Sequence, residues 1–200
     1  MIFDIVVFDG LDELDAIGPL EVLRRAHRPE RPVTTRLVHH GDQTRVTGAF
    51  GLRIDIDKQW VLGEADVVIV VGGGWAKRAP VGAWAEHERG VIEPMIAASR
   101  DVTRVVAGVC TGTMLIAHAG LARGRRASTH HSSLAELAAL GVDVVGDRVV
   151  DDGDLVTCGG VTSGIDLALW LVEREIDATL ADSIASNLEY SRQRPFGALR

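Results

Sequence analysis

The segment from Gly108 to Gly112 places Cys110 between two glycines, each two residues away. An apolar run of strand length precedes it and a helical pattern follows it. This is the spacing of a nucleophile elbow, in which the nucleophile lies on a strained strand-to-helix turn and small neighbours avoid collision. The amide end of the following helix is expected to favour the thiolate, the reactive form of cysteine. The sequence therefore predicts a nucleophilic thiol rather than a buried structural cysteine.

Other polar or glycine-rich segments also follow predicted strands. Asp15 comes after the first apolar run, Gly73 and Gly74 follow the third, and His130 closes a short extended piece. Loops at the carboxyl ends of parallel strands collect at one edge of a sheet, where ligands bind. We therefore expect these residues to converge on Cys110.

Each candidate partner of Cys110 has two possible roles. Asp15 either complements the dipole of the helix that it begins, or faces Cys110 as a protonated carboxyl that hydrogen-bonds the thiolate. The backbone amides of Gly74 and Thr111 are candidates for an oxyanion hole. The glycine triplet is equally consistent with a closely packed turn, and it lacks the lysine and spacing of a phosphate-binding loop.

The histidines show no recognisable metal-ligand spacing with each other, the cysteines or nearby acids, so we expect no zinc site. His130 is the best candidate to polarise the thiol of Cys110. The alternative is that His130 and His131 form a pair of surface histidines without a role at the thiol. His118, in a predicted helix beside alanines, is interpreted as structural. Cys158 lacks the elbow spacing and is interpreted as a buried filler near the site.

The elements that must position these residues follow an alternating order. Continuous apolar runs at 2–8, 33–38, 67–71 and 105–109 are typical of parallel strands covered on both faces. Helical patterns follow at about 15–26, 113–119, 164–173 and 177–190. Strands that alternate with helices predict an α/β, doubly wound, mainly parallel sheet with helices on both faces.

Two predicted hairpins interrupt this order as small insertions. One spans residues 44–56, and the other pairs 144–150 with 155–158 across an Asp-Asp-Gly-Asp turn. Neither a linker-like change of composition nor an internal repeat divides the chain. The prediction is a single domain over residues 1–200.

Composition excludes several classes of protein. Lys and Arg number 21 against 28 Asp and Glu, which gives a net charge of −7. One short basic stretch at 123–126 is interpreted as a solvated loop. Because binding to nucleic acid requires clustered positive charge, we expect no nucleic-acid partner. Two cysteines without Cys-x-x-Cys spacing, and no recognisable signal peptide, indicate a cytoplasmic protein. The charge-free stretch 105–122 changes character midway, so no membrane insertion is expected. Trp60, Trp75 and Trp84 could lie in the core or at an interface.

Together these motifs resemble the DJ-1/PfpI (ThiJ) superfamily, in the right order over nearly the whole chain. The resemblance is strongest to its isonitrile hydratase branch, which has aspartate opposite the cysteine and a Cys-Thr-Gly elbow. The segments that carry it are 14–19, 72–74, 108–112, 127–130, 159–166, 189–190 and 195–196. The Thr-His-Trp of that branch is Thr-His-His at 129–131 here, so one pocket wall differs. No helix-turn-helix region follows, unlike in related transcriptional regulators.

The resemblance implies a flavodoxin-like fold, a homodimer, no cofactor, and a small electrophilic substrate. It makes Cys110 the nucleophile and Asp15 its carboxyl partner, with Thr111 and Gly74 near the reacting atoms and Thr111 orienting water. The implied reaction is the hydration of isonitriles to N-substituted formamides. Other thiol chemistry on small electrophiles (glyoxalase, deglycase or amidase) is the runner-up, and a non-catalytic redox sensor is the alternative from a different class.

Overall fold

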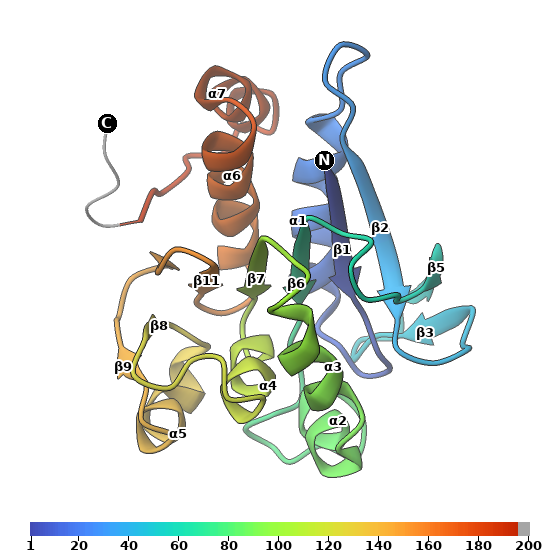
Figure 1. Ribbon diagram of the computed structural model, residues 1–200, viewed down its shortest axis with the longest axis vertical. Coiled ribbons are helices and arrows are strands. Elements are labelled where there is room, and N and C mark those ends of the chain that lie inside the picture. The colour runs from blue at the N-terminus through green and yellow to red at the C-terminus, as the bar shows by residue number, and fades with distance from the viewer. Residues whose placement is uncertain (196–200) are drawn as a thin grey trace.

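A computed structural model describes residues 1–195, which build a seven-stranded sheet of order β10-β11-β7-β6-β1-β2-β5 (Figure 1). Every neighbouring pair is parallel except β10 and β11. This arrangement confirms the predicted α/β class. In chain order the strands of this sheet are β1 Ile2–Val6, β2 Thr34–His39, β5 Lys58–Gln59, β6 Val67–Val70, β7 Val105–Gly108, β10 Val149–Asp151 and β11 Leu155–Cys158.

Helices connect the strands and pack in two groups, one of α1, α6 and α7 and the other of α2, α3 and α4 (Figure 1). Asp12 caps α1 by accepting a hydrogen bond from the amide of Leu14 at 3.3 Å. Asp177 caps α7 in the same way, with the amide of Leu180 at 2.7 Å. The helices are α1 Glu13–Arg25, α2 Ala83–Arg89, α3 Ile92–Ser99, α4 Gly112–His118, α5 Leu134–Ala139, α6 Ser163–Glu175 and α7 Ala178–Asn187.

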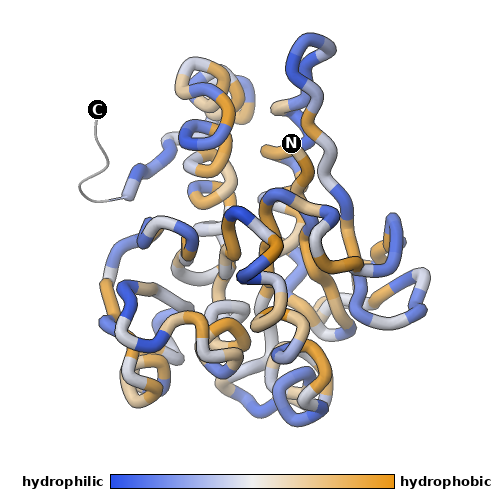
Figure 2. Tube along the Cα trace, viewed as in Figure 1, coloured by the Kyte–Doolittle hydropathy of each residue, from blue (hydrophilic) through white to orange (hydrophobic). Residues whose placement is uncertain are grey.

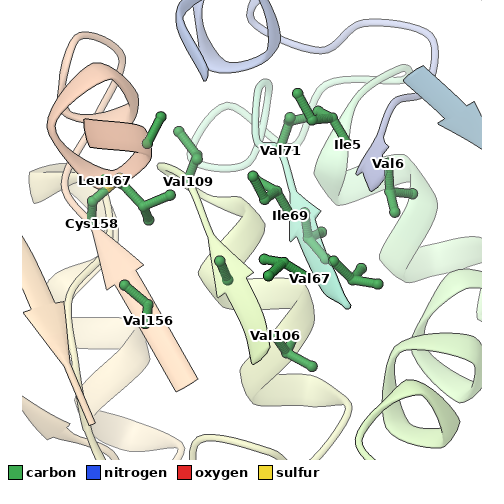
Figure 3. Packing of buried hydrophobic residues seen from close by; sticks show 14 of the residues in the cluster. Ile5, Val6, Val67, Ile69, Val71, Val106, Val109, Val156, Cys158 and Leu167 are labelled. Carbon is green, nitrogen blue, oxygen red and sulfur yellow. The ribbon is translucent and has the colours of Figure 1, made fainter. Parts of the chain in front are cut away.

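The core lies on the central strands, where every residue of β6, β7 and β11 is buried. Figure 3 shows side chains of β1, β6, β7 and β11 packing with Leu167 of α6, and Figure 2 shows the same strands as the apolar centre of the chain. Full burial of each such side chain contributes about 1.5–3 kcal/mol. Trp60 and Trp75 are also buried, which settles their place in the core.

Helix α1, which carries Asp15, lies close to α6 because a glycine on each helix makes room for a larger side chain of the other. A Cβ on Gly18 would approach Ile165 to 3.1 Å, and one on Gly164 would approach Pro19 to 3.2 Å. This close contact joins the two helices that begin at the carboxyl ends of β1 and β11. It therefore fixes two sides of the region where Cys110 lies.

The predicted hairpins differ in outcome. The first is confirmed as β3 Arg45–Thr47 paired with β4 Arg53–Asp55. The second is confirmed as β10 paired antiparallel with β11, but the two strands form an edge of the central sheet rather than an insertion, and β10 is shorter than the predicted strand. Residue 144 instead belongs to β9 Asp143–Val144, which pairs in parallel with β8 Arg126–Ala127. Helix α7 is also shorter than the predicted span 177–190, and position 196 of the predicted tail motif lies outside the described residues.

The charge-free stretch 105–122 contains β7, the elbow and α4. Within residues 1–195, no helix is long and apolar enough to cross a membrane. The basic stretch 123–126 that follows is mostly exposed, as predicted; within it Arg125 is half-buried and forms ion pairs with Asp152 at 2.8 Å and Asp154 at 2.6 Å.

Candidate active site

The elbow has the geometry that its glycines require. Cys110 has φ +55°, a left-handed conformation that is uncommon outside glycine. A Cβ on Gly112 would lie 2.1 Å from the carbonyl oxygen of Val70, and one on Gly108 would lie 2.6 Å from Thr113 Oγ1. The hydroxyl of Thr129 donates to the carbonyl of Cys110 at 2.8 Å. The strain at the cysteine is therefore held by close packing on both sides.

The carboxyl ends of β1, β6, β7 and β11 bring four distant segments together at this point. Asp15 comes from the first turn of α1, and its Oδ2 accepts a hydrogen bond from the amide of Gly72 at 3.1 Å. The Asp15 carboxyl and the Cys110 thiol interact directly, because each shifts the pKa of the other. The structure thus brings together the two side chains that the sequence singled out.

Asp15 is fully buried, and its pKa is raised to about 8. Burial is the main cause, and the charge of Asp12 adds to it, while hydrogen bonding with Cys110 and with the amides of Gly72 and Val161 opposes it. At neutral pH the carboxyl therefore holds its proton. Oδ1 of Asp15 is buried and has no hydrogen-bond partner among residues 1–195.

The thiol of Cys110 has a raised pKa, so the predicted preference for thiolate was wrong for the free site. Burial is the main cause and the charge of Asp15 adds to it; the amides of Val161 and Thr111 oppose both. The N-terminus of a helix contributes only about 0.3–1 kcal/mol, and α4 has seven residues. Desolvation of the thiol of Cys110, a residue that is 5% exposed, outweighs that contribution.

The glycine triplet at 72–74 is explained by packing. A Cβ on Gly72 would lie 2.5 Å from the amide nitrogen of Thr111, and one on Gly73 would lie 2.5 Å from that of Asp12. The amide of Gly73 donates to Oγ1 of Thr111 at 2.9 Å, which leaves the hydroxyl proton of Thr111 free to donate. Gly74, with φ +72°, lines the pocket.

Val161 is a site residue that the sequence analysis missed. It follows β11 and has φ +49°, a rare conformation for a β-branched residue. Its amide hydrogen-bonds with the sulfur of Cys110, as does that of Thr111. The amides at the sulfur are therefore those of Thr111 and Val161, whereas the oxyanion hole predicted from Gly74 and Thr111 concerns charge on the substrate and stays a prediction. Two glycines directly before Val161 were the only signal of a close backbone approach.

His130 lines the same pocket as Cys110, and in the part of the chain that the structure describes no hydrogen bond joins its ring to the thiol. Its Nδ1 lies 2.7 Å from the hydroxyl of Ser132, and burial together with His131 lowers its pKa. A Cβ on Gly160 would lie 2.2 Å from the His130 ring, so the ring packs on this loop. Cys158 is fully buried, in agreement with its interpretation as a filler.

The sulfur lies at a pocket of about 560 Å³ whose lining is mainly apolar. Phe50, 83% exposed at the turn of the β3–β4 hairpin, forms part of its rim. The carboxylate of Glu13 holds this turn by accepting from the amide of Phe50 at 2.7 Å. The lining residues are Gly10, Asp12, Ala49, Phe50, Gly73, Gly74, Trp75, Ala76, Lys77, Ala79, Val81, Cys110, Thr111, His130, Ser132 and Val161.

A doubly wound sheet with a cysteine elbow and a buried carboxyl defines the class, and the chain belongs to the DJ-1/PfpI family, whose profile matches residues 4–174. Isonitrile hydratase of Pseudomonas putida is 36% identical over 195 residues, 96% of this chain and 79% of that protein. The transcriptional regulator CdhR of Pseudomonas aeruginosa is 25% identical, over 96% of this chain and 56% of its own. A ThiJ/PfpI family protein from Pseudomonas syringae superposes with a TM-score of 0.83 at 25% identity, over 100% of this chain and 78% of its own.

Proposed function

We propose that the protein hydrates isonitriles to N-substituted formamides, with Cys110 as nucleophile and Asp15 as the acid and base. The observation that carries the proposal is the buried Asp15 carboxyl, which interacts with the thiol of Cys110 and whose Oδ1 has no hydrogen-bond partner among residues 1–195, while Cys110 itself lines the pocket. A carboxyl that is protonated near neutral pH can donate its proton to a substrate atom, as a general acid does. The 36% identity to isonitrile hydratase supports the choice of substrate.

In the first step the sulfur attacks the terminal carbon of the isonitrile. The sulfur lone pair forms the S–C bond, and the same carbon takes the proton of Asp15, which gives a thioimidate and an Asp15 carboxylate. The amides of Thr111 and Val161 stabilise the thiolate before attack. This step needs one proton on the Cys110–Asp15 pair. Loss of a proton from Asp15 leaves its carboxylate beside the thiol, and transfer of the thiol proton to Asp15 then gives the reactive form, thiolate and carboxylic acid.

In the second step water adds to the thioimidate carbon. Asp15 relays a proton from water to the nitrogen, while the hydroxyl of Thr111 orients the water. The C–S bond then breaks, the thiolate leaves, and the proton of the new hydroxyl returns to Asp15. The products are the formamide and the starting pair, so atoms and charges balance.

The redox-sensor alternative is less well supported by the site. Peroxide reacts with thiolates, and burial raises the pKa of the Cys110 thiol. The neighbouring carboxyl of Asp15 can take the thiol proton and pass it to a substrate. A redox sensor has no need for such a proton transfer. Thiol chemistry on glyoxal-type aldehydes or amides would use the same residues. Only a turnover experiment distinguishes these reactions from isonitrile hydration.

The test is turnover of two substrates by the purified protein. Incubation with a simple alkyl isonitrile is expected to give the N-alkylformamide, followed by NMR, at a rate proportional to protein concentration. A parallel incubation with methylglyoxal measures lactate. Lactate without formamide would replace the proposal with the glyoxalase alternative, and no product from either would remove the enzyme assignment.

The rate is expected to rise with pH and to level off above about pH 8. Below the raised pKa of Asp15, near 8, the pair holds both protons and must lose one before it reaches the reactive form. The measurement is kcat/KM for an alkyl isonitrile from pH 5 to 10. A profile that is flat, or that falls between pH 6 and 8, would contradict this assignment of the proton.

Phe50→Ala is expected to weaken selectivity for bulky isonitriles. The exposed ring forms the pocket rim, and loss of its apolar contact costs about 1–3 kcal/mol, or roughly 10- to 100-fold in kcat/KM for an aromatic isonitrile. Methyl isonitrile, which is too small to reach the rim, is the matched substrate control. Equal losses for both would show that Phe50 acts through folding instead.

We also propose that the protein is a homodimer and that it is cytoplasmic, as the family resemblance implies. Membership of the DJ-1/PfpI family supports both. Sedimentation equilibrium of the purified protein tests the first, with twice the chain mass as the expected result.

A further inference from the structure

The fold groups three residues that no sequence motif connects. His87 in α2, Glu93 in α3 and His118 at the end of α4 each place one possible ligand atom within 4.8 Å of the other two. Their separations of 6 and 25 residues match no metal-binding pattern, which is why the sequence indicated no such set. Packing of the three helices against each other creates the group (Figure 1).

One atom of this group is left without a partner. Nε2 of His118 is buried and has no hydrogen-bond partner among residues 1–195. Nδ1 of His87 lies 2.6 Å from Oε1 of Glu93, and the two imidazole rings lie 4.1 Å apart. Buried polar nitrogens are nearly always bonded, so a pairing of His87 with Glu93 alone does not account for the cluster.

We propose that His87, Glu93 and His118 bind a divalent transition metal of the Zn²⁺ and Co²⁺ type. Two imidazoles and one carboxylate suit these ions, and three protein ligands leave a fourth position for water. At metal–ligand distances of about 2.0–2.1 Å, tetrahedral ligand atoms lie about 3.3 Å apart. On metal binding, the 2.6 Å contact between His87 and Glu93 must therefore lengthen to about 3.3 Å. The distances from the ligand atom of His118 to those of His87 and Glu93 must reach about the same value.

The metal would stabilise a wall of the pocket rather than act on the substrate. Trp75, which lines the pocket, has its ring 5.4 Å from that of His87 and 5.5 Å from that of His118. Its indole nitrogen donates to Glu136 at 3.0 Å, so the ring is held from both sides. His118 lies at the far end of α4 from the elbow, about 9 Å along the helix axis.

The test is titration of the EDTA-treated protein with CoCl₂ and with ZnCl₂. We expect one equivalent of Co²⁺ to give visible absorption bands and to quench Trp75 fluorescence, and Zn²⁺ to displace it and raise the melting temperature. His118→Gln and Glu93→Gln are expected to weaken Co²⁺ binding at least about 100-fold, since even outer partners of metal ligands cost 10- to 100-fold. Melting of the metal-free variants checks that they fold.

Control variants separate this site from other metal-binding groups. His131→Gln removes one ring of the His130–His131 pair, and Cys110→Ala removes the thiol that lines the pocket; both are expected to keep full Co²⁺ affinity. No binding by the unmodified protein, or equal binding by the His118→Gln variant, would overturn the proposal. These readouts do not depend on isonitrile turnover, so the two proposals fail separately.

Discussion

Replacement of Cys110 by alanine is expected to lower turnover of an alkyl isonitrile at least about 10³-fold, because no other group can form the thioimidate. The elbow geometry persists in the variant, since Gly108, Gly112 and the hydroxyl of Thr129 hold the backbone independently of the sulfur. The measurement is kcat from single-turnover and steady-state formamide production. Cys158→Ala is the matched control, because it removes a buried thiol near the site and should keep most of the activity.

Asp15→Asn belongs to the same prediction, because the proton that reaches the isonitrile carbon comes from this carboxyl. The amide keeps an oxygen for the Gly72 amide but neither donates an acidic proton nor accepts one, so kcat should fall at least about 10²-fold. Asp12→Asn makes the same chemical change at the pocket and preserves the helix cap. Unimpaired turnover by the Asp15 variant, with or without loss in the Asp12 control, would remove the mechanism.

Short-range sterics explain why the elbow was predictable. A Cβ added to Gly112 would lie 2.1 Å from the carbonyl oxygen of Val70 and clash with it, so the turn is encoded in the residue types of five consecutive positions. The same holds for the parallel strands, whose continuous apolar runs predict burial on both faces. Convergence of Asp15 on Cys110 then follows from the sheet, because both follow parallel strands at its carboxyl edge.

Properties that depend on the whole three-dimensional surroundings of a residue, such as its pKa, were not predictable in this way. The direction of the Cys110 pKa shift results from a competition between burial and a helix terminus, and the depth of burial is not encoded in the motif. Val161 acts through its backbone amide, so its side-chain type carries no signal of its role. The grouping of His118 with His87 and Glu93 depends on how three helices pack, which spacing along the chain does not reveal.

The buried carboxyl has a thermodynamic consequence that can be measured without any substrate. Asp15 has a pKa of about 8 in the folded protein and 3.8 as its ordinary value. Between these values the folded chain binds a proton that the unfolded chain has lost, so stability falls as pH rises, by about 1.4 kcal/mol per unit. Below pH 3.8 both states are protonated and the effect vanishes; above pH 8 the loss is complete.

Asp15→Asn is therefore expected to stabilise the protein, and increasingly so as pH rises. The asparagine has no charge to bury, so its advantage over the unmodified protein should grow by about 3–4 kcal/mol between pH 5 and pH 8. Any fixed cost of burying the amide is the same at both pH values and drops out of the comparison. For a chain of this size the gap in melting temperature should widen by roughly 6–15 °C, measured by calorimetry at each pH. A gap that stays constant would show that Asp15 is ionised in the folded protein across this range, and it would also deprive the proposed reaction of its proton donor.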